Sequence, residues 1–141
     1  MDTMRWKDGS LILLDQTKLP VKMMYITCTR WNEVRDAIRI LAVRGAPAIG
    51  VAAAYGMVLA AYELLKNNHT ITTSDYIADL QRISKKMDAA RPTAVNLHWA
   101  LSQVMTTVNH MTAATAWEIT KVLEKQAIAM QHEDVSINTA L

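Results

Sequence analysis

The chain has 141 residues and a mass of 15.8 kDa, which suits about one domain that is large enough to bury a core. Its 15 basic and 13 acidic side chains give a formal net charge of +2, and because the basic residues form no block, the charge pattern does not indicate nucleic-acid binding. A single cysteine excludes an intrachain disulfide framework and fits a reducing cytoplasm, which is the location that we predict.

The N-terminal part of the chain is predicted to form strands. Short alternating apolar runs at residues 11–14 and 21–26, separated by a polar turn at 15–20, predict a small antiparallel β meander within residues 1–29. The start of the chain is charged and lacks the apolar core of a signal peptide. Cys28 lies in an apolar, extended segment, and we interpret it as a buried structural thiol.

From residue 30 onward the apolar spacing becomes helical, and it predicts a bundle of about five helices over residues 30–141. The predicted fold class is therefore mainly α, with residues 1–141 as one domain. The stretch at 45–62 carries no charge, but it contains Pro47 and barely reaches the length of about 18 to 20 residues that a membrane span needs. A central buried helix at 49–65 explains it better, and we predict no membrane association.

Polar residues ahead of the apolar stripes predict where the later helices begin. Thr73 or Ser74 is the expected N-cap of one helix, and Thr93 is the expected N-cap of a helix that starts at about residue 95. Thr115 with Glu118 forms a capping-box signature for the last helix. The predicted apolar stripes comprise Val34, Ala37, Ile38 and Leu41, then Ile77, Leu80, Ile83 and Met87, then Leu97, Leu101, Val104, Val108 and Met111, and finally Ile119, Val122, Leu123, Ala127 and Met130.

The segment RGAPAIG at 44–50 places an arginine at a helix start that we predict near Ala46. Pro47 suits the first helical turn, where its missing N–H would have no partner, and Gly45 allows a tight turn and the close approach of a ligand. Free N–H groups, the helix dipole and Arg44 together favour a phosphate or a carboxylate. The alternative is an arginine that is only solvated or salt-bridged.

A second segment, at 91–96, repeats this pattern. Arg91 precedes a proline, which disfavours helical geometry at Arg91 and places its side chain ahead of the next helix. Two arginines and several backbone donors that converge on one anion could hold a phosphomonoester, since each charge-assisted hydrogen bond contributes about 1.5 to 3 kcal/mol. The alternative is that Arg91 caps the C-terminus of a neighbouring helix.

Other site chemistry is not indicated. The histidines are scattered without the spacing of a zinc site, and the sequence contains no glycine-rich nucleotide loop, so we predict no metal and no cofactor. Glu133 and Asp134 are adjacent and point to different sides of a helix, which argues against a paired acid/base role. We therefore assign no catalytic residue within residues 1–141.

Four segments resemble the methylthioribose-1-phosphate isomerase family, in the superfamily that also contains the alpha, beta and delta regulatory subunits of the translation initiation exchange factor. RGAPAIG at 44–50, after a predicted helical run at 32–43, and RPTAVNL at 91–97 resemble its two most specific motifs. LDQTKLP at 14–20 and HEDV at 132–135 resemble two further segments, in the same order and at approximately the same spacing.

The resemblance implies conversion of 5-methylthioribose 1-phosphate to 5-methylthioribulose 1-phosphate, an aldose-ketose isomerisation in methionine salvage. It implies a two-domain, homodimeric enzyme whose catalytic cysteine and aspartate lie in a Rossmann-like second half beyond residue 141. Carried over to this chain, it makes Arg44, Gly45, Ala46 and Arg91 substrate-binding and no residue catalytic. Residues 1–141 alone are therefore expected not to isomerise the sugar phosphate. They are also expected to bind it far more weakly than the full-length enzyme would, because the remaining phosphate ligands and the closing wall would be missing.

Two other classes of function stay open at this stage. One is a binding protein that resembles the translation-factor subunits and lacks isomerase chemistry. The other is a free-standing helical module that docks on a partner. The reading frame after residue 141 would separate the module from a domain of a longer enzyme, and the sequence does not show whether the boundary there is natural, proteolytic or chosen.

Overall fold

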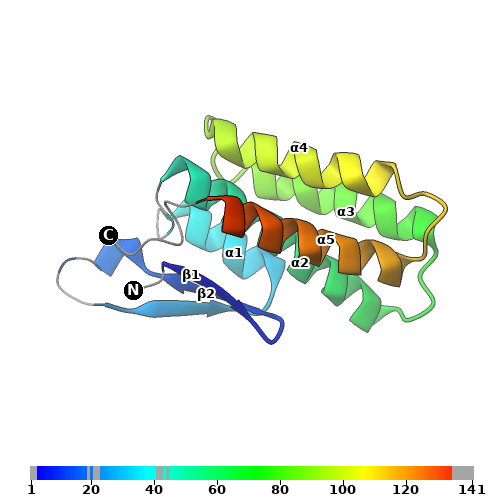
Figure 1. The fold of residues 1–141 in the computed structure, drawn as a ribbon, viewed down its shortest axis with the longest axis horizontal. Helices are drawn as coiled ribbons and strands as arrows, with labels where there is room; N and C mark the ends of the chain where they lie inside the picture. Colours follow the sequence, from blue (N-terminus) through cyan, green and yellow to red (C-terminus); the bar gives the residue numbers. More distant parts are fainter. Residues whose placement is uncertain (1–2, 19, 21–22, 41–42, 44, 135–141) are drawn as a thin grey trace.

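The computed structural model describes residues 3–18, 20, 23–40, 43 and 45–134 (Figure 1). Within them a three-stranded antiparallel sheet precedes five α-helices, which confirms the predicted mainly α class. In chain order the elements are β1 (Met4–Lys7), β2 (Ser10–Leu14), the 3-10 turn η1 (Gln16–Lys18), β3 (Tyr25–Cys28), α1 (Trp31–Arg39), α2 (Ala46–Asn67), α3 (Thr73–Asp88), α4 (Val95–Asn109) and α5 (Ala116–Glu133).

The sheet has the strand order β1-β2-β3, so the predicted meander is confirmed. Asp8 and Gly9 join β1 to β2 with φ angles of 51° and 73°, which is the backbone geometry of a tight two-residue hairpin turn. Strand β1 was not predicted, because its four residues are too few to establish an alternation. The third strand was placed too early, since β3 begins only at Tyr25.

Helix α2 forms the centre of the helical part. All its residues from 49 to 61 are buried, and α1, α3, α4, α5 and both strands of the first hairpin contact it. By length and composition alone α2 could cross a membrane, but 72% of its most apolar window is buried inside the protein. This burial on all sides is typical of a core helix and confirms the predicted central helix. The observed helix extends from Ala46 to Asn67, whereas the predicted one covered 49–65.

Two glycines allow other helices to approach α2 closely. A Cβ atom on Gly50 would lie 3.0 Å from the carbonyl oxygen of Asn96 in α4, and a Cβ atom on Gly56 would lie 2.5 Å from Cε of Met87 in α3. Neither position accepts a side chain unless its neighbour moves. The contact at Gly50 fixes the start of α2 against the start of α4.

The N-cap residues of the helices agree only in part with those predicted. Thr115 and Glu118 form the predicted capping box of α5. The cap of α3 was placed wrongly, because Thr72 Oγ1 accepts from the N–H of Asp75 while the Thr73 hydroxyl donates to a carbonyl of another segment. The cap of α4 was also wrong, since Ala94 occupies this position without a side-chain hydrogen bond.

Most residues of the predicted stripes are buried, with identifiable exceptions. Val122 is 37% exposed, Leu41 lies outside the described residues, and α1 ends at Arg39 rather than continuing to residue 43. Half-buried members of the stripes are Ile77, Ile83, Met111 and Met130. Buried polar side chains were not predicted; they are Asp15, Ser84, Thr120 and Gln131, together with the hydroxyl of Tyr76.

Candidate anion-binding site

Two helix starts in the described chain lack any capping by a side chain. Gly45, the N-cap of α2, has φ 89° and ψ 127° and makes no side-chain hydrogen bond, and Pro47 lies in the first turn as predicted. The N-cap of α4 is equally without a side-chain bond. The first N–H groups of both helices are therefore available to an external acceptor, and each helix dipole places partial positive charge there.

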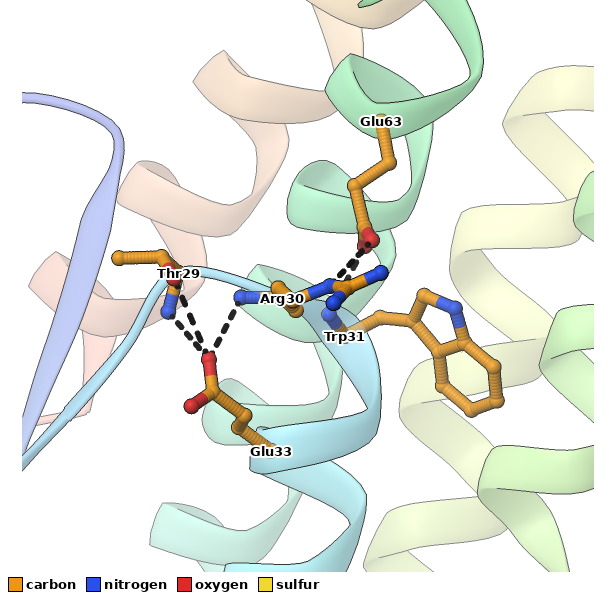
Figure 2. A network of polar contacts seen from close by, with 5 residues as sticks. All are labelled: Thr29, Arg30, Trp31, Glu33 and Glu63. Atoms are coloured by element: carbon orange, nitrogen blue, oxygen red, sulfur yellow. Dashed lines mark hydrogen bonds and ion pairs between the residues drawn. The ribbon is translucent and has the colours of Figure 1, made fainter. Parts of the chain in front are cut away.

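The other helix starts are satisfied by the protein itself. A threonine caps α3 and another caps α5. In α1 the N–H of Trp31 donates to Glu63 at 3.0 Å, and Glu33 accepts from the N–H groups of Thr29 and Arg30 at 3.0 and 3.1 Å (Figure 2). Only α2 and α4, among the helices that the structure describes, leave their first turns without such partners.

The uncapped starts of α2 and α4 meet at one pocket, which we call the anion pocket. Figure 1 shows both starts at the same end of the bundle, beside the end of α5. The anion pocket has a volume of about 390 Å³. Its lining residues are Gly45, Ala46, Ile49, Arg91, Thr93, Ala94, Val95 and Asn96. Three of the four predicted site residues, Gly45, Ala46 and Arg91, therefore lie together, whereas Arg44 lies outside the described residues.

The guanidinium of Arg91 is not engaged in an ion pair with any carboxylate of the described chain. It also bonds no carbonyl there, which removes support for the alternative that it caps a neighbouring helix. By contrast, Arg30 pairs with Glu63 at 3.3 Å, and Arg82 pairs with Asp79. A partly exposed, unneutralised guanidinium beside two free helix starts is an arrangement that attracts an anion.

A second pocket of about 310 Å³ lies next to the anion pocket and shares Asn96 with it. We call it the apolar pocket, because Pro47, Val51, Trp99 and Met130 supply most of its wall. Gly50, Glu133 and Asp134 complete the lining. The sequence analysis predicted none of these as site residues, because the end of α5 and the start of α2 are far apart in the chain.

The opposite end of α2 carries a larger cavity of about 610 Å³ with polar walls. Its acidic side chains hold the fold together. Glu63 is bonded as described above, and Glu124 accepts from the Tyr62 hydroxyl at 2.6 Å and from Trp6 Nε1 at 2.9 Å. Lys121 Nζ lies 3.2 Å from the same carboxylate. Both carboxylates are therefore occupied by protein donors, which leaves this cavity less suited to a ligand than the anion pocket.

Cys28 is fully buried and free, which confirms its interpretation as a structural thiol. Burial, and secondly the negative charge of Glu33, raise the pKa of its thiol to about 12, so the thiolate is not formed near neutral pH. Across the described ranges, no three histidine, cysteine, aspartate or glutamate side chains lie close enough together to hold a metal ion.

Known proteins of similar sequence share almost the whole of this chain. The model of a family described as the initiation factor 2 subunit family matches residues 42–141. A protein of Pelotomaculum thermopropionicum named methylthioribose-1-phosphate isomerase is 45% identical over 139 residues, which is 98% of this chain and 37% of that protein. One of Pseudothermotoga lettingae named methylthioribose-1-phosphate isomerase 2 is 43% identical, over 96% of this chain and 37% of that protein.

Two solved structures resemble this fold closely. The 5-methylthioribose 1-phosphate isomerase of Pyrococcus horikoshii has a TM-score of 0.86 and 30% identity, over 95% of this chain and 36% of that one. The delta subunit of the translation initiation factor eIF-2B from A. fulgidus has a TM-score of 0.84 and 35% identity, over 96% of this chain and 38% of that one. The chain thus spans less than two fifths of the length of these relatives.

Proposed function

We propose, because the chain belongs to the initiation factor 2 subunit family, that residues 1–141 form the N-terminal, phosphate-binding domain of a sugar-phosphate isomerase. The reaction would convert 5-methylthioribose 1-phosphate to 5-methylthioribulose 1-phosphate, as the names of the relatives suggest. The observation that carries this proposal is the anion pocket, where Gly45, Ala46 and Arg91 line one space between two uncapped helix starts.

The domain would contribute to the reaction by positioning. A phosphate on the anomeric oxygen prevents ordinary ring opening, so acid/base groups must assist opening and then the transfer between C1 and C2. The described residues offer no reactive thiol, since Cys28 is buried. These groups would come from polypeptide beyond residue 141. Binding the phosphate away from the reacting bonds holds the sugar in place and lowers the barrier through orientation.

Calorimetric titration of the chain with 5-methylthioribose 1-phosphate tests the phosphate site. We expect measurable binding that inorganic phosphate competes for, and an absence of binding would contradict the proposal. An assay of the same chain should detect no turnover. Turnover that Cys28→Ser abolishes would overturn both the expected inactivity and the structural role of Cys28.

A second candidate is a binding protein like the eIF-2B subunits. It is supported by the 35% identity to the A. fulgidus subunit, which is below the 45% and 43% identity to the two bacterial proteins named as isomerases. It predicts that the longer protein binds the sugar phosphate without converting it. A homodimer and a cytoplasmic location stay predictions, which sedimentation of the longer protein and cell fractionation would test.

A further inference from the structure

We propose that a hydrogen bond between His98 and Asp88 holds the loop at 89–94 in the shape that presents Arg91 to the anion pocket. The inference rests on the proposed function, because it concerns the same phosphate group. It makes His98 and Asp88 positioning residues. Neither lines the anion pocket, and both act on the phosphate through Arg91.

The loop at 89–94 supplies much of the wall of the anion pocket. It connects α3 to α4, which pack against each other (Figure 1), and Arg91, Thr93 and Ala94 line the pocket. Within the loop the N–H of Ala94 donates to the carbonyl of Arg91 at 3.0 Å. The side chains of Arg91 and Thr93 make no hydrogen bond to any residue that the structure describes. The side chains of the loop therefore do not themselves fix where the guanidinium lies.

The bond between His98 and Asp88 joins the two ends of this loop. Nδ1 of His98 lies 3.0 Å from Oδ2 of Asp88. Because an ionised carboxylate only accepts, Nδ1 carries the hydrogen and donates it, whether the imidazole is neutral or protonated. Asp88 is the last residue of α3 and His98 lies near the start of α4, so one contact ties the two helix ends that the loop connects. A loop that is held in this way loses less conformational freedom when it binds an anion.

Neither side chain is placed where its charge would stabilise its own helix. Asp88 lies at the C-terminal end of α3, where the helix dipole disfavours a negative charge. His98 lies near the N-terminal end of α4, where the dipole disfavours a positive charge. Asp88 also precedes Arg91 by only three residues, and its charge would repel an anion. The stability of the two helices and the attraction of an anion therefore do not account for this pair, whereas the holding of the loop does.

The test is a calorimetric titration of the chain and of Asp88→Ala with inorganic phosphate and with 5-methylthioribose 1-phosphate. Asp88→Ala removes a negative charge, so electrostatic attraction alone would make both anions bind more tightly. Loss of the positioning bond should instead weaken the binding of both by about 2- to 5-fold, the range expected for a pair whose side chains are partly exposed. The direction of the change thus distinguishes positioning from charge.

Two variants of His98 and one matched control complete the experiment. His98→Ala should weaken binding as Asp88→Ala does. His98→Asn should restore it, because the amide nitrogen of asparagine can donate from nearly the position of Nδ1. Asp79→Ala is the control, since it removes the same charge from α3 at a residue that is paired with Arg82, and it should not weaken binding.

The mobility of the loop gives a second measurement. The ¹⁵N heteronuclear NOE of the Ala90 and Thr93 amides should fall in Asp88→Ala and in His98→Ala. It should stay unchanged in Asp79→Ala, and circular dichroism would check that each variant is folded.

The outcomes separate the inference from the proposed function. Unchanged or tighter binding by Asp88→Ala, equal weakening by Asp79→Ala, or binding by His98→Asn as weak as by His98→Ala would overturn the positioning role while the phosphate site stands. Failure of the unchanged chain to bind either anion would refute the proposed function, and this inference with it.

Discussion

The two ends of α2 use their polar groups in opposite ways. At the C-terminal end, Glu63 bonds to the start of α1 and Tyr62 bonds to Glu124 of α5, which in turn accepts from Trp6 of the hairpin. At the N-terminal end, Gly45 and Ala46 offer backbone N–H groups without side-chain acceptors, beside the unpaired guanidinium of Arg91 in the described chain. Hydrogen-bonding capacity that stabilises the fold at one end is available for a ligand at the other.

This difference is informative because both ends carry cavities, and the larger one is at the end where the carboxylates are engaged. Cavity size alone would select the end whose acidic side chains are already bonded to protein donors. Whether polar groups already have protein partners is the better criterion, since a group that holds the fold together must break those bonds to bind a ligand. The following changes test whether the two ends are independent.

Leu59→Ala should have the largest effect, and on stability alone. Leu59 is 2% exposed and lies toward the C-terminal end of α2. Removal of its side chain leaves a cavity and should lower the free energy of unfolding by about 2 to 5 kcal/mol. Urea denaturation would measure this. Phosphate affinity of the folded variant should not change, and a clear loss of affinity would mean that the two ends are coupled.

Arg91→Ala should have the next largest effect, and on binding alone. Loss of a charge-assisted hydrogen bond of about 1.5 to 3 kcal/mol predicts roughly 10- to 100-fold weaker binding of 5-methylthioribose 1-phosphate. Arg82→Ala is the control, because it removes the same charge from a residue that is paired with Asp79. Calorimetry would measure the affinity of both variants for the sugar phosphate. Equal losses of affinity would show that Arg91 acts only through long-range electrostatic attraction and not through a direct hydrogen bond. In the longer protein, Arg44→Lys should weaken substrate binding by about 1 to 3 kcal/mol, because lysine keeps the charge but loses the bidentate fork.

Glu124→Gln should lower stability by about 1 to 2 kcal/mol near neutral pH, because Trp6 and Tyr62 lose a shared charged acceptor. Burial raises the pKa of Glu124, but hydrogen bonds from Tyr62, Trp6 and Lys121 outweigh burial and bring it below 4.5. The folded state therefore binds fewer protons than the unfolded state just below pH 4.5. The stabilisation is complete above that pH and is lost as the pH falls further.

Urea denaturation of both proteins between pH 7 and a pH of about 3 would follow this loss. The difference in unfolding free energy between the unchanged chain and Glu124→Gln should shrink toward acid. A difference that stays constant across this range would show that the charge of Glu124 is not what stabilises the contact between the hairpin and α5.

Cys28→Ala should have the smallest effect, about 1 kcal/mol of unfolding free energy, as for the removal of one buried heavy atom. The raised pKa of about 12 keeps the thiol protonated in the folded state, whereas the unfolded thiol ionises near pH 9. Alkaline pH should thus destabilise the unchanged chain more than the variant. A thiol reagent should react with the chain only in urea, and rapid reaction of the folded chain would contradict the assigned burial.

The sequence predicted the fold class because periodicity is a local property. The change from alternating to helical spacing and the uncharged stretch around Gly50 were sufficient for the meander, the central helix and the start of α2 at Ala46. Cap assignment failed at Thr73, because its hydroxyl bonds to the distant carbonyl of Ala114 instead of its own helix. It failed at Thr93 because α4 begins one residue later than such a cap requires, with Ala94 at the N-cap.

The residues around the candidate site were likewise predictable only in part. Arg91 was found beside Gly45 and Ala46 because two segments share an arginine-then-proline pattern, and the pocket indeed joins these residues. Trp99 and Met130 carried no such signal. They line one pocket only because the start of α4 and the end of α5 lie beside the start of α2, which depends on how helices pack and not on spacing within any one segment.

The buried side chain of Gln131 has a consequence for how the chain folds. Its amide donates to the carbonyl of Met4 at 2.9 Å, and its oxygen accepts from the hydroxyl of Tyr55, so the first strand is held by the last helix. During synthesis the N-terminal hairpin leaves the ribosome early and can contact α2 once that helix has formed, but its bonds to Gln131 can form only after α5 has been made. Closing so long a loop slows folding. Until then the edge of β1 lacks the contact that holds it to α5, and an edge strand that is not held can pair with other chains.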